Sequence, residues 1–354
     1  MAREHITQAD SYLVTWTVEP GEAGSRLDLF LKEKYRRLSR EFLQRSIREG
    51  KVTLNHKQTK PSQVLRVGDK VYALSTRGNE PPVDFNYKVL FEDDHVLVID
   101  KPGNLPVHPT GRYFFHTLLT QLRVQNGNEV DQKKEFYIVH RLDRETSGVM
   151  VIGKNPAATA SLVGQFGKRE TGKEYLALVH GVVERDSFAV DAPLAQDGRS
   201  EIRLKMSVVE MGADGEPLYV PKSEVLPART EFQVVERLRG LTLLRCLPHT
   251  GRQHQIRVHL WHSGHGIAGD KLYGPDADFF LRSMSEEVEL PVGEGMSLKR
   301  HALHAHSLSF THPVTGQPLR FVSPLPDDIA AIVNRSRLAP PPVQFSPNLG
   351  TLSP

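Results

Sequence analysis

The sequence of 354 residues contains a single cysteine, Cys246, and no long apolar run. One cysteine excludes an internal disulfide framework and a zinc site built from cysteines. The apolar runs fall well short of the roughly 20 residues that span a bilayer, so no membrane segment is expected. The N-terminus also lacks the positive start and apolar stretch of a secretory signal. These absences predict a cytoplasmic protein.

Internal repeats and a glycine-rich cofactor fingerprint are absent as well, so no nucleotide cofactor is indicated. Charged residues make up 25% of the chain and hydrophobic residues 39%, which is the balance of globular domains. The length exceeds one average domain and fits two, one of them small.

Charge is modest overall but unevenly placed. Residues 25–60 hold eleven Lys and Arg against four Asp and Glu, a local charge of +7, which leaves −4 for the rest of a chain whose total is +3. A compact basic segment suggests a polyanionic partner. On charge alone, a solvated helix face is the simpler explanation.

The basic segment has the pattern of a small domain. Residues 1–17 show little periodicity and are expected to be a loose lead-in. Apolar residues then recur at helical spacing from Arg26, and Ser39 is placed to cap a second helix that ends at Gly50. Alternating residues after that helix indicate short strands, so 18–75 predicts two helices followed by a β unit.

Residues 76–87 hold a proline pair and a glycine and are predicted to be a linker. The body at 88–330 alternates strand-like and helix-like segments, which indicates the α+β class with a second, larger domain. Residues 336–354 contain five prolines and few charges, so this tail is predicted to be disordered.

The segment HRLDRETSG, His140–Gly148, stands directly ahead of the apolar run Val149–Ile152. Five ionisable residues in six positions next to a buried strand are costly unless they pair or act. Asp143, flanked by arginines, is expected to stay ionised, which is the state that a nucleophile or general base needs. Without further information, a turn with surface salt bridges is slightly favoured.

Two further segments carry polar groups among apolar ones. In TGRQHQIRVH, a helix would place Arg257 on the side of His254, where it could orient a carboxylate by a bidentate bond. A solvent-facing amphipathic helix explains the same pattern. In KEYLALVHG, strand alternation puts Tyr175 on one face with Ala177 and Val179, where a tyrosine is usually core filler.

Taken in order, these segments resemble the motifs of RluA-type pseudouridine synthases. HRLDRETSG resembles the family signature of His-Arg-Leu-Asp, two variable residues and Thr-Ser-Gly, while KEYLALVHG and HTGRQHQIRVHLWHSGHGIAGDKLYG resemble the second and third motifs. LVIDKPGNLPVHP looks like the family's lead-in strand and loop, and LHAHSLSFTHPVTG like its closing segment. The resemblance extends from about residue 85 to about residue 328.

The resemblance implies an isomerase with a mixed, mainly antiparallel sheet, no cofactor and no metal. Asp143 matches the catalytic aspartate, Arg257 the arginine that pairs with it, and Tyr175 the tyrosine that stacks on the target uracil. Arg141 matches the arginine that takes the place of the flipped nucleotide, since the target must leave its stack to react. His140, Arg252 and Lys101, in the same motifs, are expected to bind substrate.

The stretch SRLDLFLKEKYRRLSREFLQRSIREGKVTLNHK resembles the S-four (alpha-L) RNA-binding domain, whose helix pair presents basic side chains to RNA. The resemblance implies structured RNA as the partner. The protein is expected to be a monomer. The expected phosphate contacts are Arg36, Arg37, Arg40, Arg45 and Arg48.

Several alternatives remain at this point. A metallohydrolase would use the histidine clusters at 254–265 and 301–306, but the spacings of five, three and three in the first do not form one ligand face. A non-catalytic RNA-binding protein would be free to lose Asp143, which is present. The RNA is large-subunit ribosomal RNA or transfer RNA, and the loop His108–Tyr113 resembles transfer-RNA-acting relatives. Nucleophilic attack and a glycal route both remain open for Asp143.

Overall fold

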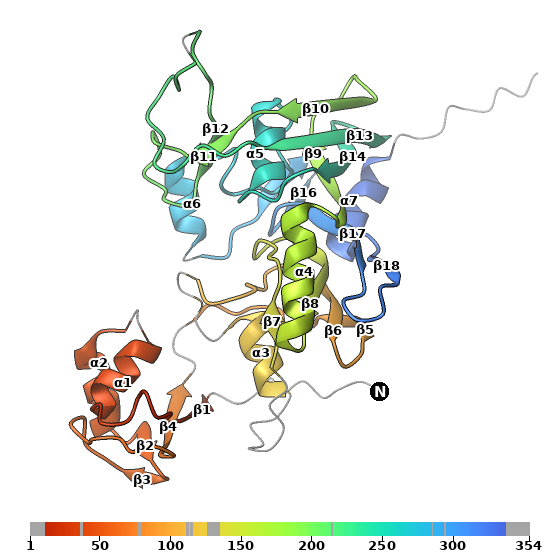
Figure 1. Cartoon of the computed structure of the whole chain (residues 1–354). Helices are drawn as coiled ribbons and strands as arrows, with labels where there is room; N and C mark the ends of the chain where they lie inside the picture. Colours follow the sequence, from red (N-terminus) through yellow and green to blue (C-terminus); the bar gives the residue numbers. More distant parts are fainter. Residues whose placement is uncertain are drawn as a thin grey trace, which may run out of the picture. The chain divides into compact units, whose positions relative to one another are not determined.

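A computed structural model describes most of the chain (Figure 1). By contact density the chain divides into two compact units, residues 1–83 with 108–136, and residues 84–107 with 137–354. The expected linker at 76–87 spans the first of these boundaries. The described residues are 11–35, 38–76, 80–110, 113, 116–125, 135–213, 215–284, 286–293 and 295–337.

The first unit contains a four-stranded sheet in the order β1-β4-β2-β3, formed by β1 (Ser11–Thr17), β2 (Val52–Leu54), β3 (Lys57–Gln58) and β4 (Lys70–Thr76). Strand β1 corrects our expectation of a loose lead-in at 1–17. Its residues pair antiparallel with β4 over their full length, from Ser11 opposite Thr76 to Thr17 opposite Lys70. The strand depends on this distant partner, which local periodicity does not show.

Two helices pack against this sheet, α1 (Leu27–Lys34) and α2 (Arg40–Arg48), while α3 (Leu118–Gln125) also belongs to the first unit. As predicted, Ser39 caps α2, and its Oγ accepts the Phe42 backbone N–H at 3.2 Å. Gly50 follows the helix at φ +75°, a conformation that favours glycine. The buried core joins both helices to the strands through Leu27, Phe30, Leu31, Leu43, Ile47, Val52 and Val71.

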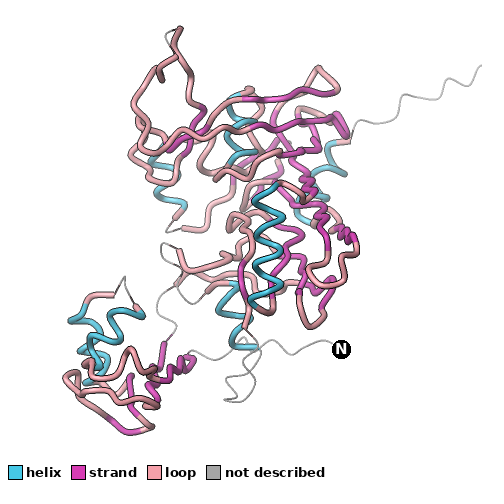
Figure 2. The backbone as a smooth tube through the Cα atoms, viewed as in Figure 1, coloured by secondary structure: helices cyan, strands magenta, loops and turns pink. Residues whose placement is uncertain are grey.

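The second unit is built on a mixed sheet of ten strands (Figure 2), which confirms the α+β prediction. Eight strands follow the order β10-β13-β14-β9-β17-β8-β6-β5, with β7 beside β8 and β18 beside β17. All pairs are antiparallel except β8 with β17. The bounds are β5 (Lys88–Glu92), β6 (Val96–Lys101), β7 (Tyr137–Ile138), β8 (Ser147–Gly153), β9 (Gly172–His180), β10 (Ser187–Asp191), β13 (Arg229–Arg237), β14 (Leu241–Pro248), β17 (Leu303–Thr311) and β18 (Pro318–Val322).

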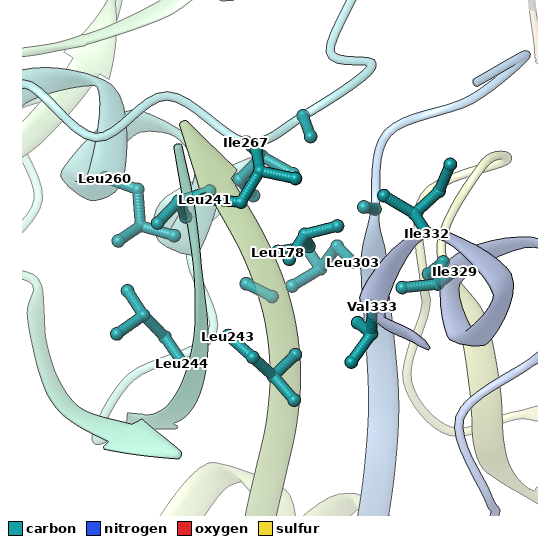
Figure 3. Close-up of a cluster of buried hydrophobic side chains, with 14 of the residues drawn as sticks. Leu178, Leu241, Leu243, Leu244, Leu260, Ile267, Leu303, Ile329, Ile332 and Val333 are labelled. Atoms are coloured by element: carbon teal, nitrogen blue, oxygen red, sulfur yellow. The ribbon is translucent and has the colours of Figure 1, made fainter. Parts of the chain in front are cut away.

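Four helices accompany this sheet, α4 (Pro156–Lys168), α5 (Gln255–His262), α6 (Ala277–Ser283) and α7 (Asp327–Ser336). Figure 3 shows part of the core, where Leu178 of β9 and Leu303 of β17 pack with Ile329, Ile332 and Val333 of α7. Leu260 of α5 joins the same cluster. A sheet buried through these contacts holds the ends of β8 and β9 in fixed positions.

The described residues of the polar stretch at 185–230 form further strands of the second unit. It contains β10, the pair β11 (Leu194–Gln196) and β12 (Met206–Val208), and the start of β13. Leu194 and Val208 are buried together with Val258 of α5 and Tyr273. The segment therefore packs against α5.

Two small features complete the fold. A second pair of short strands, β15 (Leu290–Gly293) and β16 (Met296–Leu298), follows α6. Helix α7 ends at the buried Ser336, inside the tail predicted at 336–354, and residues 338–354 lie outside the described part. No helix among the described residues is both long enough and apolar enough to traverse a membrane.

Candidate active site

A cavity of about 520 Å³ opens beside the segment that leads into β8. Its walls also come from the end of α4, the start of β9 and the loop ahead of α5. Three residues expected to act in catalysis line it together, namely Asp143, Tyr175 and Arg257. This volume is within the range of small-ligand sites.

Asp143 lies four residues before β8, in a turn where its carbonyl accepts the Thr146 N–H at 3.1 Å. Ser147 and Gly148 then carry the chain into the sheet beside β17. Gly148 has φ +114°, and a Cβ there would lie 2.2 Å from the carbonyl oxygen of Ala305, so only glycine allows this approach. The Thr-Ser-Gly part of the motif thus fixes the position of Asp143 relative to the sheet.

Arg257 joins Asp143 to a second, buried carboxylate. Its Nη1 donates to Oδ2 of Asp143 at 2.9 Å, while Nε and Nη2 donate to Asp270 at 2.7 and 2.8 Å. Asp270 in turn accepts the backbone N–H groups of Leu272 and Tyr273 at 2.9 and 3.0 Å. The guanidinium therefore has one orientation, and it presents a single N–H toward Asp143.

The Asp143 carboxyl is held ionised. Burial alone would raise its pKa, but His254, Arg257 and His301 together lower the pKa well below its ordinary value. Burial lowers the pKa of both histidines to about 4, so near neutral pH the lasting positive charge is that of Arg257. The Asp143 side chain keeps 21% exposure, which leaves its oxygens accessible from the cavity.

His254 presents one ring nitrogen to the same carboxylate. Its Nδ1 lies 2.9 Å from the Tyr273 hydroxyl, which already accepts the Met206 N–H at 3.1 Å. The Tyr273 hydroxyl can donate to Nδ1, and in that tautomer Nε2 carries the imidazole proton and lies 3.8 Å from Asp143 Oδ2. His254 precedes α5 as its N-cap, with φ +56°, instead of lying on the helix with Arg257 as we expected.

Tyr175 reaches the cavity from the middle of the sheet. Its neighbours across β9 are Cys246 of β14 and Ala305 of β17, so its backbone is fixed on both sides. Burial, with a contribution from Asp143, raises the pKa of Tyr175 far above neutrality. The side chain is thus a neutral phenol that can stack or donate a proton, and it is not an anionic base.

The residues expected to bind substrate divide into two groups. Arg141, Arg252 and His140 line the cavity, and the His140 ring stacks on Phe166 with centroids 4.5 Å apart. Lys101 is fully buried away from the cavity lining, and its Nζ donates to the carbonyls of Pro102, Leu105 and Arg144 at 2.8, 3.0 and 3.2 Å. These bonds tie the loop after β6 to the Asp143 segment.

The basic residues of the first unit differ in their surroundings. Arg40 is committed to the buried Asp28 carboxylate at 2.9 Å. Arg45 and Arg48 are exposed on α2, and Arg45 also lies 5.5 Å from the centroid of the exposed Phe42 ring. Arg36 and Arg37 lie outside the described residues.

Three histidines of the two clusters make hydrogen bonds to side chains of the protein. His259 bonds to Thr230 Oγ1 at 2.9 Å, His301 to Thr146 Oγ1 at 2.8 Å, and His304 to Ser147 Oγ at 3.0 Å. In the part of the chain that the structure describes, no group of three His, Cys, Asp or Glu side chains is arranged to hold a metal ion.

The main residue missed from the sequence is Asp270, with Tyr273 beside it. Both belong to the third motif, in GIAGDKLYG, but neither was singled out. A carboxylate directly after the small and apolar residues GIAG is the available signal, since such a group is buried only with a partner.

Comparison with known proteins identifies relatives of this chain. Residues 95–262 match the family described as RNA pseudouridylate synthase, and residues 25–71 match the S4 domain. The chain is 38% identical over 340 residues to "Ribosomal large subunit pseudouridine synthase D" of Xanthomonas campestris, covering 95% of this chain and 96% of the relative. It is 35% identical to "Ribosomal large subunit pseudouridine synthase C" of Escherichia coli K12, covering 90% and 95%.

Two solved structures are similar to this chain. "Human RNA Pseudouridylate Synthase Domain Containing 4" superposes with a TM-score of 0.55 at 28% identity, over 72% of this chain and 94% of that one. "Human RNA Pseudouridylate Synthase Domain Containing 1" shares the fold, with a TM-score of 0.51 at 23% identity.

Proposed function

Because the chain belongs to the RNA pseudouridylate synthase family and is an RNA-modifying isomerase, we propose that its target is large-subunit ribosomal RNA and that Asp143 is its catalytic carboxylate. The names of the relatives from Xanthomonas campestris and Escherichia coli support the target. The observation that carries the site is the 2.9 Å bond from buried Arg257 to an accessible Asp143. This pair supplies an ionised carboxylate of fixed direction.

The reaction detaches uracil from its ribose, turns the base and rejoins it through a ring carbon, so no atom is gained or lost. The target nucleotide has to leave its stack to enter the cavity, which costs a few kcal/mol. Tyr175 offers a neutral aromatic face that offsets part of this cost by stacking. Asp143 then attacks the sugar, or removes a sugar proton to give a glycal, and both routes require its charged form.

The electrostatics of the site favour a carboxylate that stays in place during the reaction. Arg257 is itself fixed by Asp270, so no reorganisation of charge is needed when the sugar–base bond breaks. We propose that residues 88–330 carry this chemistry, that residues 18–75 bind RNA, and that the enzyme acts as a cytoplasmic monomer without a metal. The transfer-RNA reading of the loop at His108–Tyr113 is the alternative, and Gly111 and Arg112 lie outside the described residues.

We expect the purified protein, dialysed exhaustively against EDTA, to form pseudouridine in a large-subunit ribosomal RNA transcript. Modified positions are read by carbodiimide derivatisation and primer extension, with a transfer RNA pool as the parallel substrate. Conversion of transfer RNA alone would overturn the proposed target. Activity that disappears on dialysis and returns with zinc or magnesium would overturn the metal-free reaction.

The basic helix α2 has its own test. We expect Arg45→Gln with Arg48→Gln to weaken RNA binding and to lower the slope of log affinity against log salt by roughly one unit for each charge, because phosphate contacts release counterions. Arg229→Gln, an exposed arginine paired with Asp191 and Glu231 in the second unit, is the control. An unchanged slope in the double variant would identify α2 as a solvated surface.

A further inference from the structure

The lining of the cavity holds more positive than negative side chains. Four basic side chains besides Arg257 line the cavity, and Asp143 is the one carboxylate among the lining residues. We call these four the basic rim. They are Arg141, Arg169, Lys173 and Arg252.

Within the described residues, none of the basic rim makes an ion pair with a carboxylate. Lys173 has only a long contact from Nζ to the Thr250 carbonyl at 3.5 Å, and Arg252 donates from Nε to the Pro227 carbonyl at 3.3 Å. Arg245 of the same unit, by contrast, pairs with Glu174 at 3.0 Å. Among the described residues, the charges of the basic rim therefore lack carboxylate partners.

Arg169 and Lys173 are the pair that the expected mechanism leaves unused. Arg169 follows α4 in the left-handed conformation, with φ +63°, at a position where glycine is the usual residue. Lys173 is the second residue of β9, two residues before Tyr175. Burial and the neighbouring charge of Arg169 lower the pKa of Lys173, so the two cations repel each other.

We propose that Arg169 and Lys173 form a binding site for an RNA phosphodiester next to the flipped nucleotide. A phosphate between two like charges relieves their repulsion and forms charge-assisted hydrogen bonds with both. The apolar Val163 and Phe166 beside them on the cavity wall leave a surface without competing acids. The pair thus places the strand so that the neighbouring uridine enters over Tyr175. This inference rests on an RNA substrate and is independent of which RNA is modified.

The first test compares Arg169→Gln with Lys173→Gln, singly and combined, using the shortest RNA fragment that the wild type converts. We expect the double variant to raise KM about 10-fold or more, with most of the loss in KM, and to lower the salt slope by about 0.7 units, as for the loss of one phosphate contact to a single strand. Lys168→Gln is the matched control, because Lys168 is exposed at the end of α4 and does not line the cavity.

The second test identifies the phosphate. Fragments carrying one neutral methylphosphonate linkage at a time, on each side of the target, are bound to wild type and double variant. At one linkage the wild type is expected to lose about 10-fold in affinity and the double variant to lose little, because the two changes remove the same contact. Equal losses in both proteins at every linkage would overturn the proposal.

Folding and target choice are separated from this outcome. Removing one of two repelling charges is expected to leave the thermal midpoint of Lys173→Gln unchanged or higher, and a clearly lower midpoint would assign Lys173 a structural role instead. If the wild type converts only transfer RNA, the proposed target is wrong while the methylphosphonate test still applies. If it converts the RNA and Lys168→Gln weakens binding equally, the proposed phosphate site is wrong and the function stands.

Discussion

Replacing Asp143 with asparagine is expected to abolish pseudouridine formation while RNA binding persists. Asparagine keeps the shape of the side chain and removes the charge that both possible routes need. Loss of a reacting group of this kind lowers turnover on the order of 10³-fold or more. Single-turnover conversion of the large-subunit transcript measures the loss, and a filter-binding or anisotropy titration measures the affinity.

The Asp143→Asn protein is expected to fold normally. Arg257 keeps its two bonds to Asp270, so the substitution does not leave a buried arginine without an acid. Asp186→Asn is the control for loss of a carboxylate, because that side chain is 91% exposed and pairs with the surface residue Arg237. Residual turnover of more than a few per cent of wild type would remove Asp143 from the catalytic role.

How far the sequence predicted this site depends on how local each contact is. Asp143 and the turn around it belong to one motif, and an apolar run marks the strand that follows. The turn and the strand could therefore be predicted from the sequence. Tyr175 was placed on the correct strand by alternation, and its backbone position between Cys246 and Ala305 follows from sheet order. Motif matching contributed more to these assignments than periodicity did.

Other contacts depend on the chain returning over a distance. Strand β1 pairs with β4 about sixty residues away, and the alternation within SYLVTWT is too weak to reveal it. Asp270 reaches Arg257 because the chain turns after α5 and residues 266–268 pair with β9, and no rule of spacing predicts that turn. Lys101 was assigned to substrate because it stands in a motif, whereas the structure gives its amino group three backbone carbonyls.

For His254 the sequence predicted the right neighbour, Arg257, but the wrong backbone conformation. A continuous helix would have placed it one turn before Arg257, on the same side. Instead the backbone turns left-handed at His254 and the helix begins one residue later. Both side chains still approach Asp143, because the turn and the first helical turn converge on one carboxylate.

Arg257→Met is expected to lower turnover at neutral pH by about two to three orders of magnitude and to make it steeply pH-dependent. In the wild type the Asp143 pKa lies below its ordinary value, so the carboxylate is charged across the neutral range and its charge limits activity only in acid. Without Arg257, burial raises the Asp143 pKa, and the negative Asp270 raises it further. Activity should therefore fall as pH drops from 8 to 6, where the wild type is flat. Turnover over this range is the measurement.

A stability measurement separates this electrostatic effect from damage to the fold. Burial alone would raise the pKa of Asp270, but Arg257 lowers it to about 2, so removing Arg257 leaves a buried, unpaired charge at a cost of about 3–5 kcal/mol in unfolding free energy. Arg257→Met with Asp270→Asn removes both charges and is expected to recover most of that stability. Its turnover should stay low, since Asp143 still lacks its partner.

Arg245→Met is the matched control for loss of an arginine ion pair. Arg245 pairs with Glu174 at 3.0 Å but is 46% exposed, so its loss should cost less than about 1 kcal/mol and leave the pH profile flat. If the Arg257→Met profile were as flat as that of the control, Arg257 would not be what keeps Asp143 ionised. If the double variant recovered turnover together with stability, the arginine would be a structural residue, and the orientation of Asp143 would have to come from His254 and the turn that precedes β8.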